Sequence, residues 1–128
     1  MKLLEKAEKE DFNMNEEILQ MMNIYNTFNF DWMGDEIKTP FDLTRHHIKK
    51  KQHDGENSIN NYALLTTNSH HLIHYLEVNY NKEYNLINKL LLELNQSGKE
   101  PTEEYFSEMK KILKIVKKDI KNKKRKRK

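Results

Sequence analysis

Helical spacing of apolar residues marks both ends of the chain. Residues 14–28 place apolar side chains three apart, with Asn13 or Asn15 as the candidate N-cap and Glu16 and Glu17 in the first turn. Residues 80–120 carry two such stripes, and the Gly and Pro of residues 96–101 are typical of a helix end followed by a helix start. The stripes are Leu86, Ile87, Leu90, Leu91 and Leu94, then Tyr105, Phe106, Met109, Ile112, Leu113 and Val116. We expect an N-terminal helix and a C-terminal αα-hairpin whose second helix is capped by Thr102.

The middle of the chain has a different rhythm. Residues 43–48 and 62–66 are short apolar runs, and the polar stretch between them holds the Asp54-Gly55 turn signal. Residues 69–79 return to helical spacing, with Thr67 or Asn68 as the N-cap. This order predicts strand, long turn, strand and helix. An irregular segment before it is rich in large apolar residues, which we expect to fill the core: Phe28, Phe30, Trp32, Met33 and Phe41.

Composition limits the class of protein. The 128 residues are about one domain's length, and no run of 18 apolar residues is available to span a membrane. The first residues lack the apolar core of a secretory signal, and there is no cysteine for disulfides, thiolate zinc sites or thiol nucleophiles. We therefore expect a cytoplasmic protein.

Charge is unevenly distributed. Residues 117–128 hold nine basic residues and one acidic residue, giving +8, so the other 116 residues carry −5 to reach the overall +3. We interpret this segment as a basic tail, disordered when free because its like charges repel. It is either a solvated end or a contact to nucleic acid or, in a eukaryote, a nuclear localisation patch. Its candidate contacts are Lys123, Lys124, Arg125, Lys126 and Arg127.

All six histidines fall within residues 46–74. His70 and His74 are four apart on the predicted helix, so both imidazoles can meet one metal ion. His46 and His47 are neighbours on a predicted strand and should point to opposite sides, which leaves one free for proton transfer. His71 should lie exposed on another face of the helix.

The order of these residues resembles a known family. After the His46-His47 doublet, Asn61 follows fourteen residues later, His70 nine after that, and His74 four after that. This is similar to the HNH nucleases, and the His-x3-His ending is most similar to the DNase domains of colicin-type bacteriocins. The resemblance covers residues 43–75. It implies an α+β domain over 1–116, with a ββα-metal core at about 41–79, an N-terminal helical segment (1–40) and the C-terminal αα-hairpin (80–116).

The resemblance also implies roles for these residues. His47 would be the general base, and His46, His70 and His74 would bind one divalent metal ion. Asn61 would orient His47 and its loop, although register alone does not separate it from Asn60. Three imidazoles suit Zn²⁺ or Ni²⁺ better than Mg²⁺, while Mn²⁺ and Mg²⁺ stay open.

The implied function is metal-dependent hydrolysis of DNA phosphodiester bonds, in a bacterial, phage or mobile-element protein. Basic residues beside the doublet, and the tail, are the candidate DNA contacts: Arg45, Lys49, Lys50 and Lys51. The alternatives are an inactive HNH-derived module that binds nucleic acid or protein, and an unrelated helical protein with incidental histidines. A protein partner or inhibitor stays unidentified.

Overall fold

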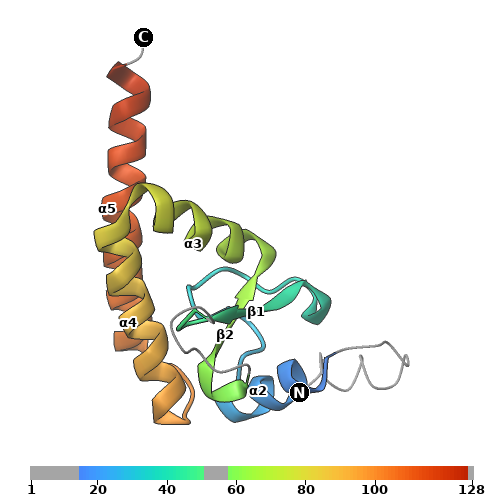
Figure 1. The fold of residues 1–128 in the computed structure, drawn as a ribbon. Helices are drawn as coiled ribbons and strands as arrows, with labels where there is room; N and C mark the ends of the chain where they lie inside the picture. Colours follow the sequence, from blue (N-terminus) through green and yellow to red (C-terminus); the bar gives the residue numbers. More distant parts are fainter. Residues whose placement is uncertain (1–14, 51–57, 127–128) are drawn as a thin grey trace.

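The computed structural model describes residues 15–50 and 58–126, with only the backbone described at 125 and 126. In this part of the chain the architecture is α+β, with one N-terminal helix, a two-stranded antiparallel hairpin and three further helices (Figure 1). The elements are α2 (Glu16–Tyr25), β1 (Leu43–His47), β2 (Tyr62–Thr66), α3 (Thr67–Asn79), α4 (Asn81–Ser97) and α5 (Glu103–Lys126), with 3-10 turns at Pro40–Asp42 and Ile59–Asn61. This confirms the predicted order of strand, strand and helix between helical ends.

The hairpin leads directly into α3. β1 and β2 pair in register from Leu43 opposite Thr66 to His47 opposite Tyr62, and every residue of β2 is buried. The N-cap of α3 is Thr66, whose hydroxyl accepts a hydrogen bond from the Ser69 N–H at 3.2 Å. The predicted caps, Thr67 and Asn68, are wrong by one or two positions because the strand passes into the helix without an intervening loop.

The helix α2 is shorter than predicted. Asn15 is its N-cap, with its side-chain oxygen accepting from the N–H groups of Glu17 and Ile18. The helix ends at Tyr25 because Asn26 adopts the left-handed conformation at φ 50°. Asn13, the other predicted cap, lies outside the described residues.

The segment after α2 only partly fills the core. Trp32 and Met33 are buried, and the indole N–H of Trp32 donates to the Thr27 hydroxyl at 3.1 Å. Phe30 and Phe41 are 54% and 47% exposed, so their prediction as core residues is wrong. Phe30 is held instead in an isolated bridge with Glu36, on the two arms of the turn that contains Gly34.

The αα-hairpin forms where it was predicted. Gly98 ends α4 in the left-handed conformation, and the Thr102 hydroxyl accepts from the Tyr105 N–H at 3.1 Å, as expected of a cap. The buried stripe of α4 contains Ile87, Leu91 and Leu94, whereas Leu86, which we had placed in it, is 43% exposed. Ile87 already occupies that turn of the inward face.

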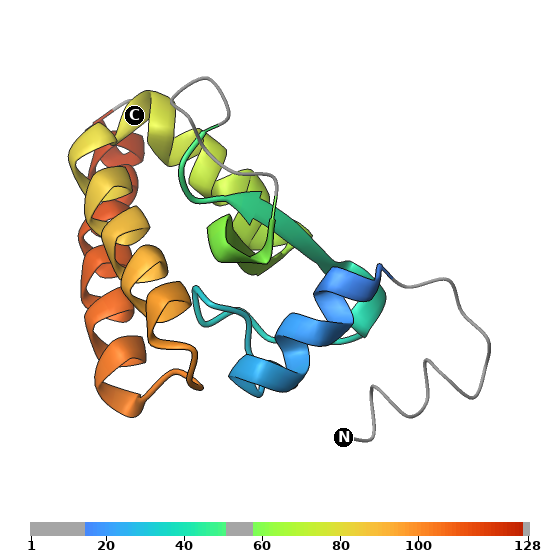
Figure 2. The same cartoon turned by 60° about the horizontal axis from the view of Figure 1, so that its bottom comes forward.

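The boundary at residue 116 is wrong, because α5 continues through the supposed tail to Lys126 and extends past the end of α4 (Figures 1 and 2). Ile120 packs partly buried against the core. Asp119 accepts a hydrogen bond from the Tyr80 hydroxyl at 2.7 Å and pairs with Lys123 at 3.1 Å. These contacts to the α3–α4 junction offset the repulsion among the basic residues, on which the prediction of disorder was based.

Among the described helices, none has the length and apolar character needed to cross a bilayer.

Candidate functional site

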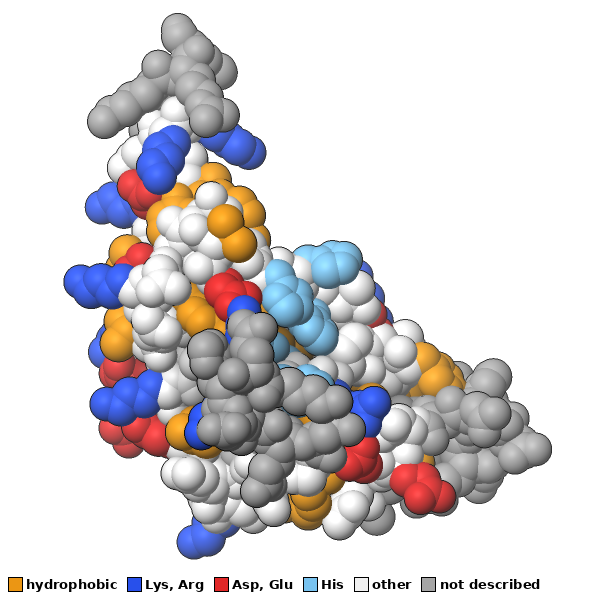
Figure 3. Space-filling model, viewed as in Figure 1, with side chains coloured by type: hydrophobic (Ala, Val, Ile, Leu, Met, Phe, Trp, Pro, Cys, Tyr) orange, Lys and Arg blue, Asp and Glu red, His pale blue; other side chains and the backbone are white. Residues whose placement is uncertain are grey.

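Three of the predicted histidines lie side by side. The ring centroid of His46 on β1 is 5.7 Å from that of His70 and 6.2 Å from that of His74, and the two rings on α3 stack at 4.8 Å. Strand alternation puts Thr44 on the same side of β1 as His46, and its hydroxyl lies 2.6 Å from Nδ1 of His70. Histidine side chains gather visibly on one face of the molecule (Figure 3).

The spacing of these rings can be compared with a metal site. An imidazole nitrogen lies about 2.1 Å from a bound Zn²⁺, which puts ring centroids about 3.2 Å from the ion and about 5.2 Å apart at tetrahedral angles. The three observed separations bracket that value. In the described residues, however, no three histidine or acidic side chains direct their ligating atoms at one point. His46 and His70 instead turn a nitrogen to Asn88 and Thr44, so the residue types and spacing fit a transition ion, whereas the side-chain torsions must adjust to bind it.

Burial keeps two of these imidazoles neutral. His46 is 5% exposed, and its burial, reinforced by the neighbouring histidines, lowers its pKa to about 4. Burial also lowers the pKa of the half-buried His70, with further contributions from His74 and His71. A neutral imidazole is the form that binds a metal ion, so neither side chain must lose a proton at pH 7.

The two members of the histidine doublet diverge, as the strand prediction requires. His47 packs edge-on against the Tyr62 ring with centroids 5.1 Å apart, on the side of β1 away from the other rings. Arg45 shares this side, where its guanidinium lies 5.2 Å from the centre of the Tyr62 ring and pairs with Glu17 of α2. The side of the hairpin that holds His47 therefore also holds an arginine and a tyrosine.

The choice between the two adjacent asparagines has a clear geometric answer. The side chain of Asn61 is buried and spans one residue of the facing chain, accepting from the Lys49 N–H at 2.8 Å and donating to the Lys49 carbonyl at 2.7 Å. Its own carbonyl accepts from the Ile48 N–H at 2.9 Å. Asn60 is exposed. Asn61 therefore fixes the chain directly after His47.

Sequence reasoning missed the residues that α4 and the end of α3 bring to the site. A hollow of about 280 Å³ adjoins His46 and is lined by Ile48, Lys49, Lys50, Glu77, Tyr84, Asn85 and Asn88. Glu77 pairs with Lys50, and its carboxylate lies 3.9 Å from Nδ1 of His74. The i, i+3 spacing of His74 and Glu77 was a signal in the sequence, whereas nothing local indicates that α4 reaches β1.

The predicted basic residues fall into two groups. Lys49 and Lys50 border the hollow beside the histidines, whereas Lys123 and Lys124 are exposed on α5. The prediction for Lys51 falls outside the described residues, as do those for Arg127 and for the side chains of Arg125 and Lys126. His71 is exposed, as predicted, and His53 lies outside the described part.

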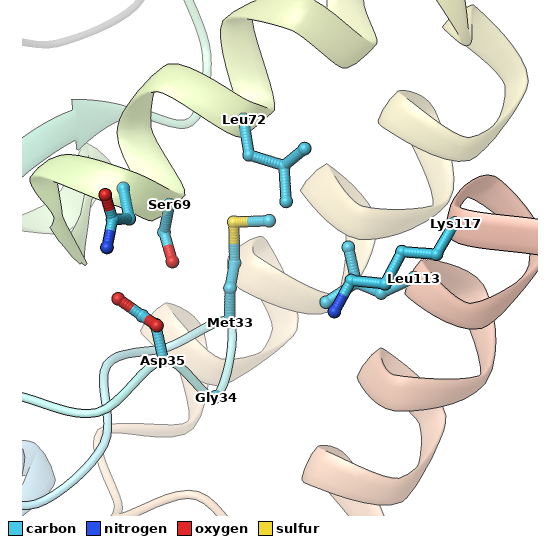
Figure 4. Close-up of a pocket in the computed structure, with 8 residues that line it drawn as sticks. Met33, Gly34, Asp35, Ser69, Leu72, Leu113 and Lys117 are labelled. Carbon is cyan, nitrogen blue, oxygen red and sulfur yellow. The ribbon is translucent and has the colours of Figure 1, made fainter. Parts of the chain in front are cut away.

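A second hollow, of about 160 Å³, lies between the 33–35 turn, α3 and α5 and is lined by Asp35 and Ser69 but by no histidine (Figure 4). The buried Asp31 lies behind it and accepts hydrogen bonds from the N–H groups of Met33, Asp35 and Thr66. Asp31 therefore ties the 33–35 turn to the start of α3. These carboxylates hold the strand–helix junction from which His70 and His74 project.

Comparison of the chain with protein-family models, with curated proteins and with solved structures found no significant match.

Proposed function

We propose that the protein is a metal-dependent endonuclease of the HNH type, with a ββα-metal core that hydrolyses DNA phosphodiester bonds. The observation that supports this best is the grouping of His46, His70 and His74, from one strand and the helix that follows the hairpin. His47 lies beside this group on the opposite side of the same strand. This combination supplies a metal-binding set and a separate proton acceptor within one short stretch of chain.

Each residue has a defined task in this mechanism. His46, His70 and His74 would hold one divalent ion, which when bound acts as a Lewis acid on the phosphate and the departing oxygen. His47 takes the proton of the attacking water, a contribution of about 10²–10⁴-fold for a well-placed general base. Asn61 holds the backbone at Lys49, two residues beyond the base, and so keeps His47 in place.

DNA would be held by two surfaces. Lys49 and Lys50 border the site, while the exposed lysines of α5 supply the basic surface that the −5 body lacks. Neutralising phosphates releases condensed counterions, so binding should weaken steeply with salt.

The experiment is plasmid cleavage by the purified full-length chain, with EDTA, Mg²⁺, Mn²⁺, Ni²⁺ or Zn²⁺ in parallel. We expect nicking with at least one transition ion and none with EDTA. His47→Ala should abolish nicking, whereas His71→Ala is the matched control, because His71 is an exposed histidine on α3. Intact plasmid under every metal condition would refute the proposal.

One observation favours the second candidate, a catalytically inactive binding module on the same scaffold. Nitrogens of His46 and His70 already have protein partners in Asn88 and Thr44, so these side chains are satisfied without a metal ion. A gel shift with DNA that needs no metal and leads to no cleavage would support this module over the nuclease.

A further inference from the structure

Asn88 of α4 makes two contacts that meet at the end of β1. Its side-chain oxygen lies 3.2 Å from Nε2 of His46, and its side-chain nitrogen donates to the Ile48 carbonyl at 3.1 Å. Tyr84, one turn earlier on α4, reaches Asn88 through a further side-chain hydrogen bond. Asn88 thus joins α4 both to the His46 ring and to the backbone two residues beyond it.

These contacts fix the orientation of the amide. The Ile48 carbonyl can only accept, so the NH₂ end of Asn88 must face it and the oxygen must face His46. The reverse orientation would set two acceptor oxygens against each other. Since the Asn88 oxygen also only accepts, the proton between the two side chains belongs to Nε2 of His46. The neutral ring then keeps its lone pair on Nδ1.

We propose that Asn88 is the positioning residue of His46: it holds the imidazole in the Nε2–H tautomer and so makes Nδ1 the atom that binds the metal ion. The metal half of this inference rests on the proposed function. Metal-binding histidines almost always donate their second ring N–H to a carbonyl or carboxylate, which fixes both tautomer and ring orientation. Asn88 supplies that acceptor from outside the strand–strand–helix segment.

The surroundings explain why the role falls to this residue. His46 is buried against α3 and α4, so the acceptor for its N–H must come from a packed element rather than from water. Asn61 holds Lys49 by two hydrogen bonds, while Asn88 holds the preceding carbonyl, that of Ile48. The backbone beyond the doublet is therefore fixed from two directions.

The test is long-range ¹H–¹⁵N NMR of the His46 ring in the full-length, metal-free protein, followed by Zn²⁺ titration. We expect the Nε2–H tautomer in the wild type and a mixture of tautomers in Asn88→Leu. Asn88→Asp keeps an acceptor for Nε2 and should keep the tautomer. The control is Asn85→Leu, the same substitution one turn away, at an exposed residue bonded to Asn81. Thermal unfolding of each variant verifies that it is folded.

Zn²⁺ affinity provides the second readout. Asn88→Leu should weaken binding about 10–100-fold, the usual effect of losing the partner of a metal-binding histidine, and Asn85→Leu should leave it unchanged. An Nδ1–H tautomer in the wild type, or identical tautomer and affinity in Asn88→Leu and Asn85→Leu, would overturn the inference. If the wild type binds no metal, the proposed function and the metal half both fail, whereas a tautomer preference lost only in Asn88→Leu still supports the positioning of His46.

Discussion

Replacing Asn61 with alanine removes the link between the two strands' ends at the candidate site. Its buried side chain makes one hydrogen bond to the N–H and one to the carbonyl of Lys49. Each such bond contributes about 1 kcal/mol net, and a group left unpaired costs about 1–3 kcal/mol when it is buried. Because Lys49 is exposed, water can satisfy part of what is lost. We therefore expect Asn61→Ala to reduce the free energy of unfolding by about 2–3 kcal/mol.

Urea denaturation followed by circular dichroism measures this change, with Asn60→Ala as the matched control. Asn60 is exposed, so its substitution should change stability by less than about 0.5 kcal/mol. Asn61→Asp keeps the acceptor for the Lys49 N–H but loses the donor to the Lys49 carbonyl, and it should fall between the two. Equal stability of Asn61→Ala and Asn60→Ala would refute the reasoning and remove the geometric ground for choosing Asn61.

Three further predictions concern the base, the helical extension and pH. His47→Ala should abolish cleavage and leave metal affinity by isothermal titration unchanged, because His47 lies on the other side of β1 from the metal-binding set; normal cleavage by the variant would show that another group is the base. Deleting residues 124–128 removes five positive charges while keeping Lys123 paired with Asp119, so log K against log salt for duplex DNA should flatten by up to about 4.5, at about 0.9 for each phosphate contact; equal slopes would mean that the helix end makes no DNA contact. Burial lowers the pKa of His46 from 6.5 to about 4, so in EDTA the unfolded chain takes up this proton first, and stability should fall by about 3 kcal/mol as pH drops from 6.5 to 4. His46→Asn should flatten that part of the pH profile of urea midpoints.

The central segment was predictable because its signals are local. Period-two burial, the turn residues and the i, i+4 histidine pair each depend on neighbours within a few positions. They were enough to place His46 and His47 on opposite sides of a strand, and His70 and His74 on one face of a helix. The short polar link between the strands and the direct entry into α3 then bring the two groups together.

The parts that were missed depend on contacts distant in sequence. Nothing around Asn88 indicates that it meets His46, 42 residues earlier. The basic end of α5 was expected to be disordered because its charge pattern was considered alone, whereas Tyr80 and Asp119 join it to the α3–α4 junction across 39 residues. Phe30 and Phe41 show the same limit, since hydrophobicity does not tell which side chains of an irregular segment face inward.

The charges beside the candidate site imply a division of labour in DNA binding. Arg45 pairs with Glu17, and Lys50 pairs with Glu77, so a phosphate must displace a carboxylate to reach either cation. Partly exposed ion pairs are worth only about 0–1 kcal/mol, which makes the exchange inexpensive but also reduces what these residues add to affinity. The exposed basic end of α5 has a net positive charge despite the Asp119–Lys123 pair, and it acts over about 10 Å at moderate salt. In the proposed nuclease α5 therefore supplies attraction to the polyanion, and the paired cations supply register at the scissile bond, where a phosphate is rewarded only when it lies close enough to replace Glu17 or Glu77.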